Sequence, residues 1–188
     1  MGYARCAAAE RRLLAALHEC GGRPGVAAVA RGLSLAGEHG ALWLGAGLTG
    51  AAADAGRRRA WLRATALVGG AHLASLGVKW SVRRARPGAV LTAPPLVRTA
   101  GPYSFPSSHA TTSAAALIAF GALFPAGERL MAPLAAAICV SRLVAGVHYP
   151  TDIVAGALLG GATARLGSRW TSAPPRTVSA GRRTGSGR

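Results

Sequence analysis

The sequence has few acidic and aromatic residues and only one lysine. Its 188 residues include 6 Asp plus Glu against 22 Lys plus Arg, which gives a formal charge of +16, and 5% of them are aromatic. Yet 51% are hydrophobic and the mean hydropathy is +0.30. Disordered chains combine high charge with low hydrophobicity, and basic nucleic-acid-binding domains seldom contain so much Ala, Leu, Val and Gly. The composition therefore favours a small membrane protein with arginines at its rims, and argues against nucleic acid as a partner.

The sequence lacks a cysteine pattern that would indicate disulfides or a metal site, and it lacks the features of a secretory signal peptide. The three cysteines, Cys6, Cys20 and Cys139, show no CxxC spacing and lie in apolar or amphipathic surroundings. We expect reduced thiols rather than a disulfide framework or a zinc site. Residues 1–21 contain no long apolar core, so they do not resemble a signal peptide.

No apolar, charge-free stretch reaches the roughly 20 residues that a transmembrane helix needs. Shorter charge-free stretches nevertheless recur at 40–53, 64–78, 110–126, 130–141 and 153–164. Flanking tryptophans and snorkelling arginines can extend such stretches, and their many Ala and Gly residues suit closely packed membrane helices. The prediction is an all-α, polytopic membrane helix bundle of about five transmembrane helices. Core helices of a soluble all-helical protein are the alternative.

Two segments precede this bundle and one follows it. Residues 4–19 place their apolar side chains on one helical face, which predicts an N-terminal amphipathic helix. A second apolar segment, 26–35, is too short to cross a bilayer. The end of the chain is rich in Arg, Ser, Gly, Thr and Pro, which predicts disorder. We therefore expect N-terminal interfacial helices in 1–38, a membrane domain in 39–167 and a disordered basic tail in 168–188.

Charged residues gather at the end of the second stretch. On a helix, Lys79, Arg83 and Arg86 would fall at i, i+4 and i+7 and form one cationic stripe. Pro87 favours an exit of the chain from the helix at this point. Such a stripe suits a phosphate, although a basic anchor for anionic lipid headgroups is the stronger explanation for this segment taken alone.

A second polar group, Pro106-Ser107-Ser108-His109, precedes the third stretch. Proline and serines at a helix start expose backbone N–H groups that favour an oxyanion or a phosphate. His109 would then lie in the first turn beside the anion. An ordinary serine-capped helix start with an incidental histidine explains this segment equally well.

A third group, from Ser141-Arg142 to His148 and Asp152, bridges the last two stretches. The spacing of four lets the Asp152 carboxylate reach back to the His148 imidazole, an arrangement typical of an oriented nucleophile or base. Asp152 alone would be explained by the helix dipole. If the helices cross the membrane alternately, all three groups lie on one face. Two histidines, one carboxylate and several cations then indicate phosphoryl transfer.

Together the three groups resemble the signature of the phosphatidic acid phosphatase type 2 (PAP2) superfamily. Its patterns are Lys-x6-Arg-Pro, Pro-Ser-x-His and Ser-Arg-x5-His-x3-Asp, and every fixed position is present between residues 79 and 152, with Ser108 where glycine is common. The resemblance implies an integral membrane lipid-phosphate phosphatase. His148 would attack phosphorus and form a phosphohistidine, and Asp152 would orient His148. His109 would protonate the leaving oxygen and later help to activate water.

The resemblance also implies how the phosphate is bound. The ligands that it indicates are Lys79, Arg86, Ser107, the Ser108 amide and Arg142, with Arg83 as a further cation. No metal and no cofactor are expected, because cationic side chains can supply the electrostatic stabilisation. The expected partners are a phosphorylated membrane lipid and the bilayer of the plasma membrane, which the chain would cross several times. The oligomeric state and the membrane face of the site stay open.

Within the superfamily, the length and the segment 32–39 are similar to small actinobacterial decaprenylphosphoryl-5-phosphoribose phosphatases. This finer resemblance implies hydrolysis to decaprenylphosphoryl-ribose in the synthesis of cell-wall arabinan precursors. The enzymatic alternative is a polyprenyl diphosphate or phosphatidylglycerophosphate phosphatase, and the non-enzymatic one is a basic membrane adaptor that binds anionic lipids. Vanadium-dependent haloperoxidases share the motifs but are larger and soluble. Glu38, His39 and Arg84 receive no role, and His72 is expected to pack inside the bundle.

Overall fold

The computed structural model describes residues 2–171. This part of the chain folds into seven α-helices and three short 3₁₀ segments, and it contains no β-strand. The α-helices are α1 (Gly2–Cys20), α2 (Pro24–Ala36), α3 (Ala41–Ala53), α4 (Arg58–Val82), α5 (Ser108–Gly121), α6 (Pro125–Val144) and α7 (Pro150–Thr171). The 3₁₀ segments are η1 (Glu38–Gly40), η2 (Ala55–Arg57) and η3 (Pro87–Val90). The prediction of an all-helical fold is confirmed, and the predicted helical segments correspond to the observed helices in order.

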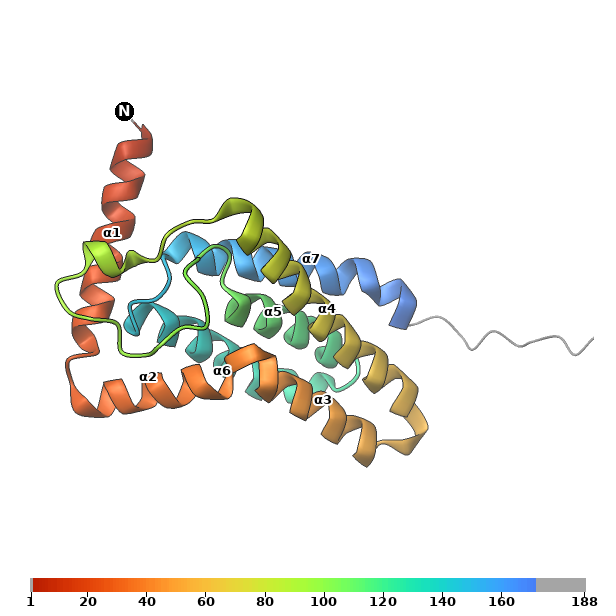
Figure 1. The fold of residues 1–188 in the computed structure, drawn as a ribbon. Helices are drawn as coiled ribbons and strands as arrows, with labels where there is room; N and C mark the ends of the chain where they lie inside the picture. The colour runs from red at the N-terminus through yellow and green to blue at the C-terminus, as the bar shows by residue number, and fades with distance from the viewer. Residues whose placement is uncertain (1, 172–188) are drawn as a thin grey trace, which may run out of the picture.

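Helix α5 lies at the centre of the bundle, in contact with α3, α4, α6 and α7 (Figure 1). Most of its buried residues are small: Ala110, Thr111, Thr112, Ser113, Ala115 and Ala116. Opposite them, a Cβ added at Gly160 of α7 would lie 2.0 Å from the carbonyl oxygen of Thr111. Only glycine permits so close an approach of two backbones, so α5 and α7 pack directly on each other.

Large apolar side chains gather where α3, α4 and the C-terminal half of α5 meet. Trp43, Trp61, Val68 and Phe120 are all at most 8% exposed. The ring centroids of Trp61 and Phe120 are 5.5 Å apart, and Trp43 Nε1 donates a hydrogen bond of 3.0 Å to Ser113 Oγ. We call this cluster of four side chains the aromatic end, and it supplies apolar burial together with satisfied polar atoms.

A long connection, residues 83–107, joins α4 to α5 and runs over the helix ends near α1 and α2 (Figure 1). Its middle is tied to the bundle by a hydrogen bond of 3.0 Å from Leu96 N to the carbonyl of Ala145. From α2, Arg31 Nε donates to the carbonyl of Leu96 at 3.2 Å. These two hydrogen bonds hold the connection against the ends of the helices.

The boundary between the third and fourth predicted stretches is wrong. The sequence predicts a continuous helix over 110–126, whereas α5 ends at Gly121 and α6 begins at Pro125. Proline suits the first position of a helix, because the N–H that it lacks would have no partner there. The same residue cannot continue a preceding helix without removing a hydrogen bond, so the chain turns.

The predicted tail and the predicted membrane spans have different outcomes. Helix α7 continues to Thr171 and thus includes residues 168–171 of the expected tail. The rest of that tail, 172–188, lies outside the described residues. For the membrane spans, no helix within residues 2–171 is both long and apolar enough to cross a bilayer.

Candidate active site

A cavity of about 710 Å³ opens where α2, α4, α5 and α6 meet the connection 83–107. Six residues predicted from the sequence motifs line it, and we call them the polar end: Lys79, Arg86, Ser108, His109, Arg142 and His148. They come from three helices, one connection and one turn, and Asp152 lies directly behind His148. The fold therefore brings the three polar groups of the sequence together at one place.

His148 lies in the turn between α6 and α7, and Asp152 lies in the first turn of α7. Both side chains are buried, with 2% and 0% exposure. His148 Nδ1 is 3.5 Å from Asp152 Oδ2 and makes no hydrogen bond, while Oδ2 accepts one of 2.8 Å from the Tyr149 backbone N–H. Catalytic hydrogen bonds are often long in ligand-free structures and tighten when substrate binds. A small movement of either side chain would bring this pair within hydrogen-bonding distance.

The surroundings of His148 favour its neutral form. Burial, together with the charges of three nearby cations, lowers the pKa of His148 to about 4, although Asp152 acts in the opposite direction. The three cations are Arg142, Arg86 and Lys79. A neutral imidazole carries a lone pair on one ring nitrogen, so His148 is able to act as a nucleophile or base at neutral pH.

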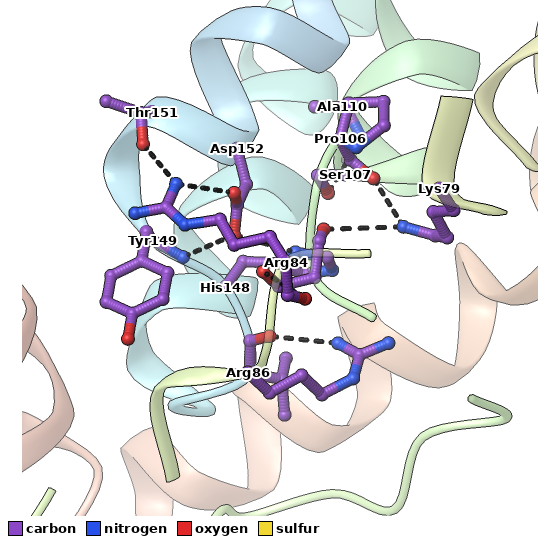
Figure 2. A network of polar contacts seen from close by, with 12 residues as sticks. Lys79, Arg84, Arg86, Pro106, Ser107, Ala110, His148, Tyr149, Thr151 and Asp152 are labelled. Atoms are coloured by element: carbon purple, nitrogen blue, oxygen red, sulfur yellow. Dashed lines mark hydrogen bonds and ion pairs between the residues drawn. The ribbon is translucent and has the colours of Figure 1, made fainter. Parts of the chain in front are cut away.

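The cationic side chains of the polar end differ in whether their N–H groups have hydrogen-bond acceptors. Lys79 Nζ donates to the carbonyl of Pro106, and Arg86 Nη1 donates to that of Val147 at 2.9 Å (Figure 2). Arg142 is 5% exposed, and its Nε has no hydrogen-bond partner. A buried donor without an acceptor is costly. An anion in the cavity would supply the acceptor that Arg142 lacks.

The N-terminus of α5 faces the cavity. Ser107 is its N-cap, because its hydroxyl accepts a hydrogen bond of 3.5 Å from the Ala110 N–H. The Ser107 N–H donates to the Asp152 carbonyl at 2.9 Å, and the buried Ser107 side chain is not among the cavity-lining residues. His109 does line the cavity, and its Nε2 donates to the carbonyl of Ser34 on α2 at 3.0 Å.

The predicted cationic stripe is wrong, because α4 ends before it is complete. Arg83 is the C-cap of α4, with a φ of 53° in the left-handed region, so the helix stops at Val82. Lys79 reaches the cavity from the helix and Arg86 from the connection. Arg83 is exposed and does not line the cavity, and its Nε donates to the carbonyl of Trp80 at 2.9 Å.

Sequence reasoning missed two residues at this site. Arg84, which received no role, forms an ion pair of 2.9 Å with Asp152. His72, expected to pack inside the bundle, lines the cavity beside His39, with ring centroids 6.2 Å apart. Its spacing of seven from Lys79 places both on one face of α4, which is the signal that could have found it. Within residues 2–171, no cluster of three or more His, Cys, Asp or Glu side chains is placed to hold a metal ion.

Comparisons with known proteins find a family and relatives that this chain resembles. The model of the PAP2 superfamily matches residues 60–176. A decaprenylphosphoryl-5-phosphoribose phosphatase from Mycolicibacterium smegmatis is 46% identical over 140 residues, which cover 72% of this chain and 73% of that protein. The enzyme of the same name from Mycobacterium tuberculosis is 44% identical over 138 residues, or 73% and 76% of the two chains.

A solved structure shows a similar fold. It is a transmembrane PAP2-type phosphatidylglycerolphosphate phosphatase from Bacillus subtilis, with a TM-score of 0.73 and 22% sequence identity. The match covers 88% of this chain and 86% of the other. The family model spans more than half of the sequence, and the motif residues converge on one cavity. The chain therefore belongs to the PAP2 superfamily.

Proposed function

We propose that this PAP2 phosphatase hydrolyses the phosphomonoester of a polyprenyl-linked sugar phosphate, with decaprenylphosphoryl-5-phosphoribose as substrate and decaprenylphosphoryl-ribose as product. The observation that carries the proposal is the identity of 46% and 44% to two enzymes of that name, over more than 70% of both chains. The product would serve the synthesis of cell-wall arabinan precursors. A cavity lined by cations and four histidines supports the choice of a phosphate ester.

In the proposed mechanism, the neutral His148 ring attacks phosphorus, forming an N–P bond while the bond from phosphorus to the leaving oxygen breaks. His109 donates a proton to that oxygen, so the alcohol leaves as a neutral product. Water then attacks the phosphohistidine, His109 takes one of its protons, and inorganic phosphate departs from a regenerated His148. Asp152 accepts a hydrogen bond from the Nδ1–H of His148 and stabilises the positive charge that develops on the ring.

The cations would hold the phosphoryl group throughout. We propose that Arg142, Lys79 and Arg86 bind its oxygens, together with the Ser108 amide at the N-terminus of α5. Two further phosphate ligands are expected from the sequence, Ser107 and Arg83. Ser107 would not contact the phosphate directly but would cap the N-terminus of α5. Arg83 lies outside the lining of the cavity.

We further propose that the enzyme is a multi-pass protein of the plasma membrane. Large apolar side chains are exposed on several helices: Leu35 71%, Leu73 67%, Leu130 77%, Leu158 69% and Leu166 82%. An apolar surface of this kind is typical of a membrane or partner contact rather than of contact with water. Extraction of membranes with alkaline carbonate tests this, and release of the chain into the aqueous fraction would contradict it.

The function is tested by phosphate release from the purified full chain in detergent. The substrates to compare are decaprenylphosphoryl-5-phosphoribose, a polyprenyl diphosphate, phosphatidylglycerophosphate and phosphatidic acid. We expect the highest kcat/KM with the first. Preference for another lipid phosphate would overturn the substrate, and folded protein that hydrolyses none of the four would overturn the activity.

A further inference from the structure

Arg84 does not line the cavity, and its guanidinium contacts Asp152 and Thr151 (Figure 2). Its Nη1 donates to Asp152 Oδ1 at 2.9 Å and to Thr151 Oγ1 at 2.6 Å. The guanidinium also lies over the ring of Tyr149, 4.0 Å from its centroid. Planar stacking and a charged hydrogen bond together fix both ends of the contact. Asp152 thus has one oxygen on Arg84 and the other toward His148.

Glu10 of α1 closes this arrangement from outside. Arg84 Nη2 donates to Glu10 Oε2 at 3.1 Å, and the other carboxylate oxygen of Glu10 accepts from the Thr151 backbone N–H at 2.9 Å. The exposed fractions of the side chains are 13% for Glu10, 31% for Arg84 and 0% for Asp152. The partly buried ion pairs are therefore less screened by solvent than surface pairs.

Neither residue belongs to the motifs that carry the activity. Arg84 occupies a variable position of the Lys-x6-Arg-Pro pattern, and Glu10 lies outside residues 60–176, which match the family model. We propose that Arg84 and Glu10 are positioning residues for the phosphatase reaction: Arg84 holds the Asp152 carboxylate against His148, and Glu10 holds Arg84 and offsets its charge. The proposal rests on the proposed function, since it assigns a role within that reaction.

The charges explain why both residues are needed. An ion pair of Asp152 with Arg84 alone has no net charge. Such a pair would stabilise only weakly the positive charge that develops on His148 during attack. Glu10 returns the group of three to a net charge of −1. The other groups that face His148 are cations or histidines, namely Lys79 on α4, His109 on α5, Arg142 on α6 and Arg86 in the connection. Glu38 also lines the cavity, where its charge acts on Arg142. The group of Asp152, Arg84 and Glu10 is therefore the negative group in contact with His148 and influences how readily His148 takes up charge.

The test uses the full-length protein in detergent and two matched pairs of variants. Arg84→Gln is compared with Arg83→Gln, and Glu10→Gln with Glu19→Gln, an exposed position on the same helix. Variants of groups that orient a reacting side chain typically lose about 10- to 100-fold in activity. We expect kcat to fall by about 30-fold in Arg84→Gln and about 5-fold in Glu10→Gln, with KM and both control variants changed less than about twofold.

The pH profile separates positioning from a merely structural role. The acid limb of kcat/KM reports protonation of His148 in the free enzyme. Removing Glu10 makes its surroundings more positive, so the limb should move to lower pH in Glu10→Gln. Removing Arg84 makes them more negative, so the limb should move to higher pH in Arg84→Gln. Arg84→Lys keeps the positive charge but loses the planar guanidinium with its paired N–H donors. We expect the acid limb of this variant at the wild-type pH and its kcat between those of the wild type and Arg84→Gln.

NMR titration of His148 in labelled protein gives the same shifts without turnover. The proposal is supported by opposite shifts of the two variants in both measurements. It is overturned if Arg83→Gln and Arg84→Gln lose equal activity, or if His148 titrates alike in all variants that keep the wild-type melting temperature. If the wild type hydrolyses no lipid phosphate, the proposed function fails, and the titration still decides whether Arg84 and Glu10 control His148.

Discussion

At the aromatic end, Trp61 and Phe120 pack ring against ring, and the indole N–H of Trp43 is satisfied by Ser113. At the polar end, the same bundle buries Arg142 and His148, and polar atoms of both lack hydrogen-bond partners. The two ends share α4 and α5, so the difference does not come from separate scaffolds. We infer that one end stabilises the bundle, whereas the other keeps buried polar groups available for the proposed ligand.

The largest expected effect comes from removing the proposed nucleophile, His148, at the polar end. His148→Asn should lower kcat about 10⁴-fold, because the covalent step is lost while the phosphate ligands remain. It should also abolish a phosphohistidine trapped by acid-free quenching of labelled substrate. A variant that keeps a tenth of the wild-type kcat would contradict the mechanism.

A smaller loss of activity is expected at Arg142, and it should come without loss of stability. Arg142→Gln should lower kcat/KM about 100-fold, because one charged donor to the phosphate is missing. The free energy of unfolding should stay the same or rise, because a buried cation with an unpartnered Nε no longer has to be desolvated. Urea unfolding measures this, and Arg165→Gln on the exposed side of α7 is the control. If Arg142→Gln lowered stability as well as activity, the polar end would also stabilise the bundle, which would contradict the proposed difference between the two ends.

The third change acts on the packing that joins both ends. Gly160→Ala should lower the free energy of unfolding by about 1–3 kcal/mol, because the new methyl group overlaps the Thr111 carbonyl. The matched control is Gly69→Ala on α4, where a Cβ meets nothing within 4 Å. That control should stabilise the protein by about 0.5–1 kcal/mol through helix propensity. Equal effects of the two substitutions would show that α5 and α7 are not in direct backbone contact.

The smallest effect is a pH dependence of stability that originates at the polar end. The pKa of His148 is about 4 in the folded protein, below its ordinary value of 6.5, so the unfolded chain binds more protons between these values. Stability is therefore present above pH 6.5 and is lost as the pH falls toward 4, by about 1 kcal/mol per pH unit from this one group. Unfolding at pH 7, 6 and 5 measures the slope, which should be shallower in His148→Asn. An unchanged slope in that variant would show that His148 is not the source.

The sequence predicts the helices and the convergence of the three polar groups because both depend on local patterns. Charge-free stretches indicate helices, and the spacing from His148 to Asp152 fixes their approach within one turn. The boundary at Pro125 is missed because an apolar run continues through the turn, and only the proline indicates the break.

The roles of Arg83 and Arg84 are beyond such patterns. They are adjacent and chemically identical, and the left-handed conformation at Arg83 decides which of them meets Asp152. A non-glycine residue adopts that conformation only where tertiary contacts favour it. The part of the cavity wall that α2 supplies, Ser34 among it, is equally hidden, because it depends on packing between distant segments.

The hydrogen bond from His109 Nε2 to the Ser34 carbonyl sets a direction for the reaction. With Nε2 occupied by a carbonyl, only Nδ1 is left to exchange protons with the departing alcohol. In the proposed mechanism, the ester would therefore enter with its scissile bond turned toward the Nδ1 edge of His109 and its phosphorus toward His148. Substrates of identical charge would then differ in turnover by how well their alcohol reaches that edge, and we expect the cavity to discriminate between them by the orientation of the ester.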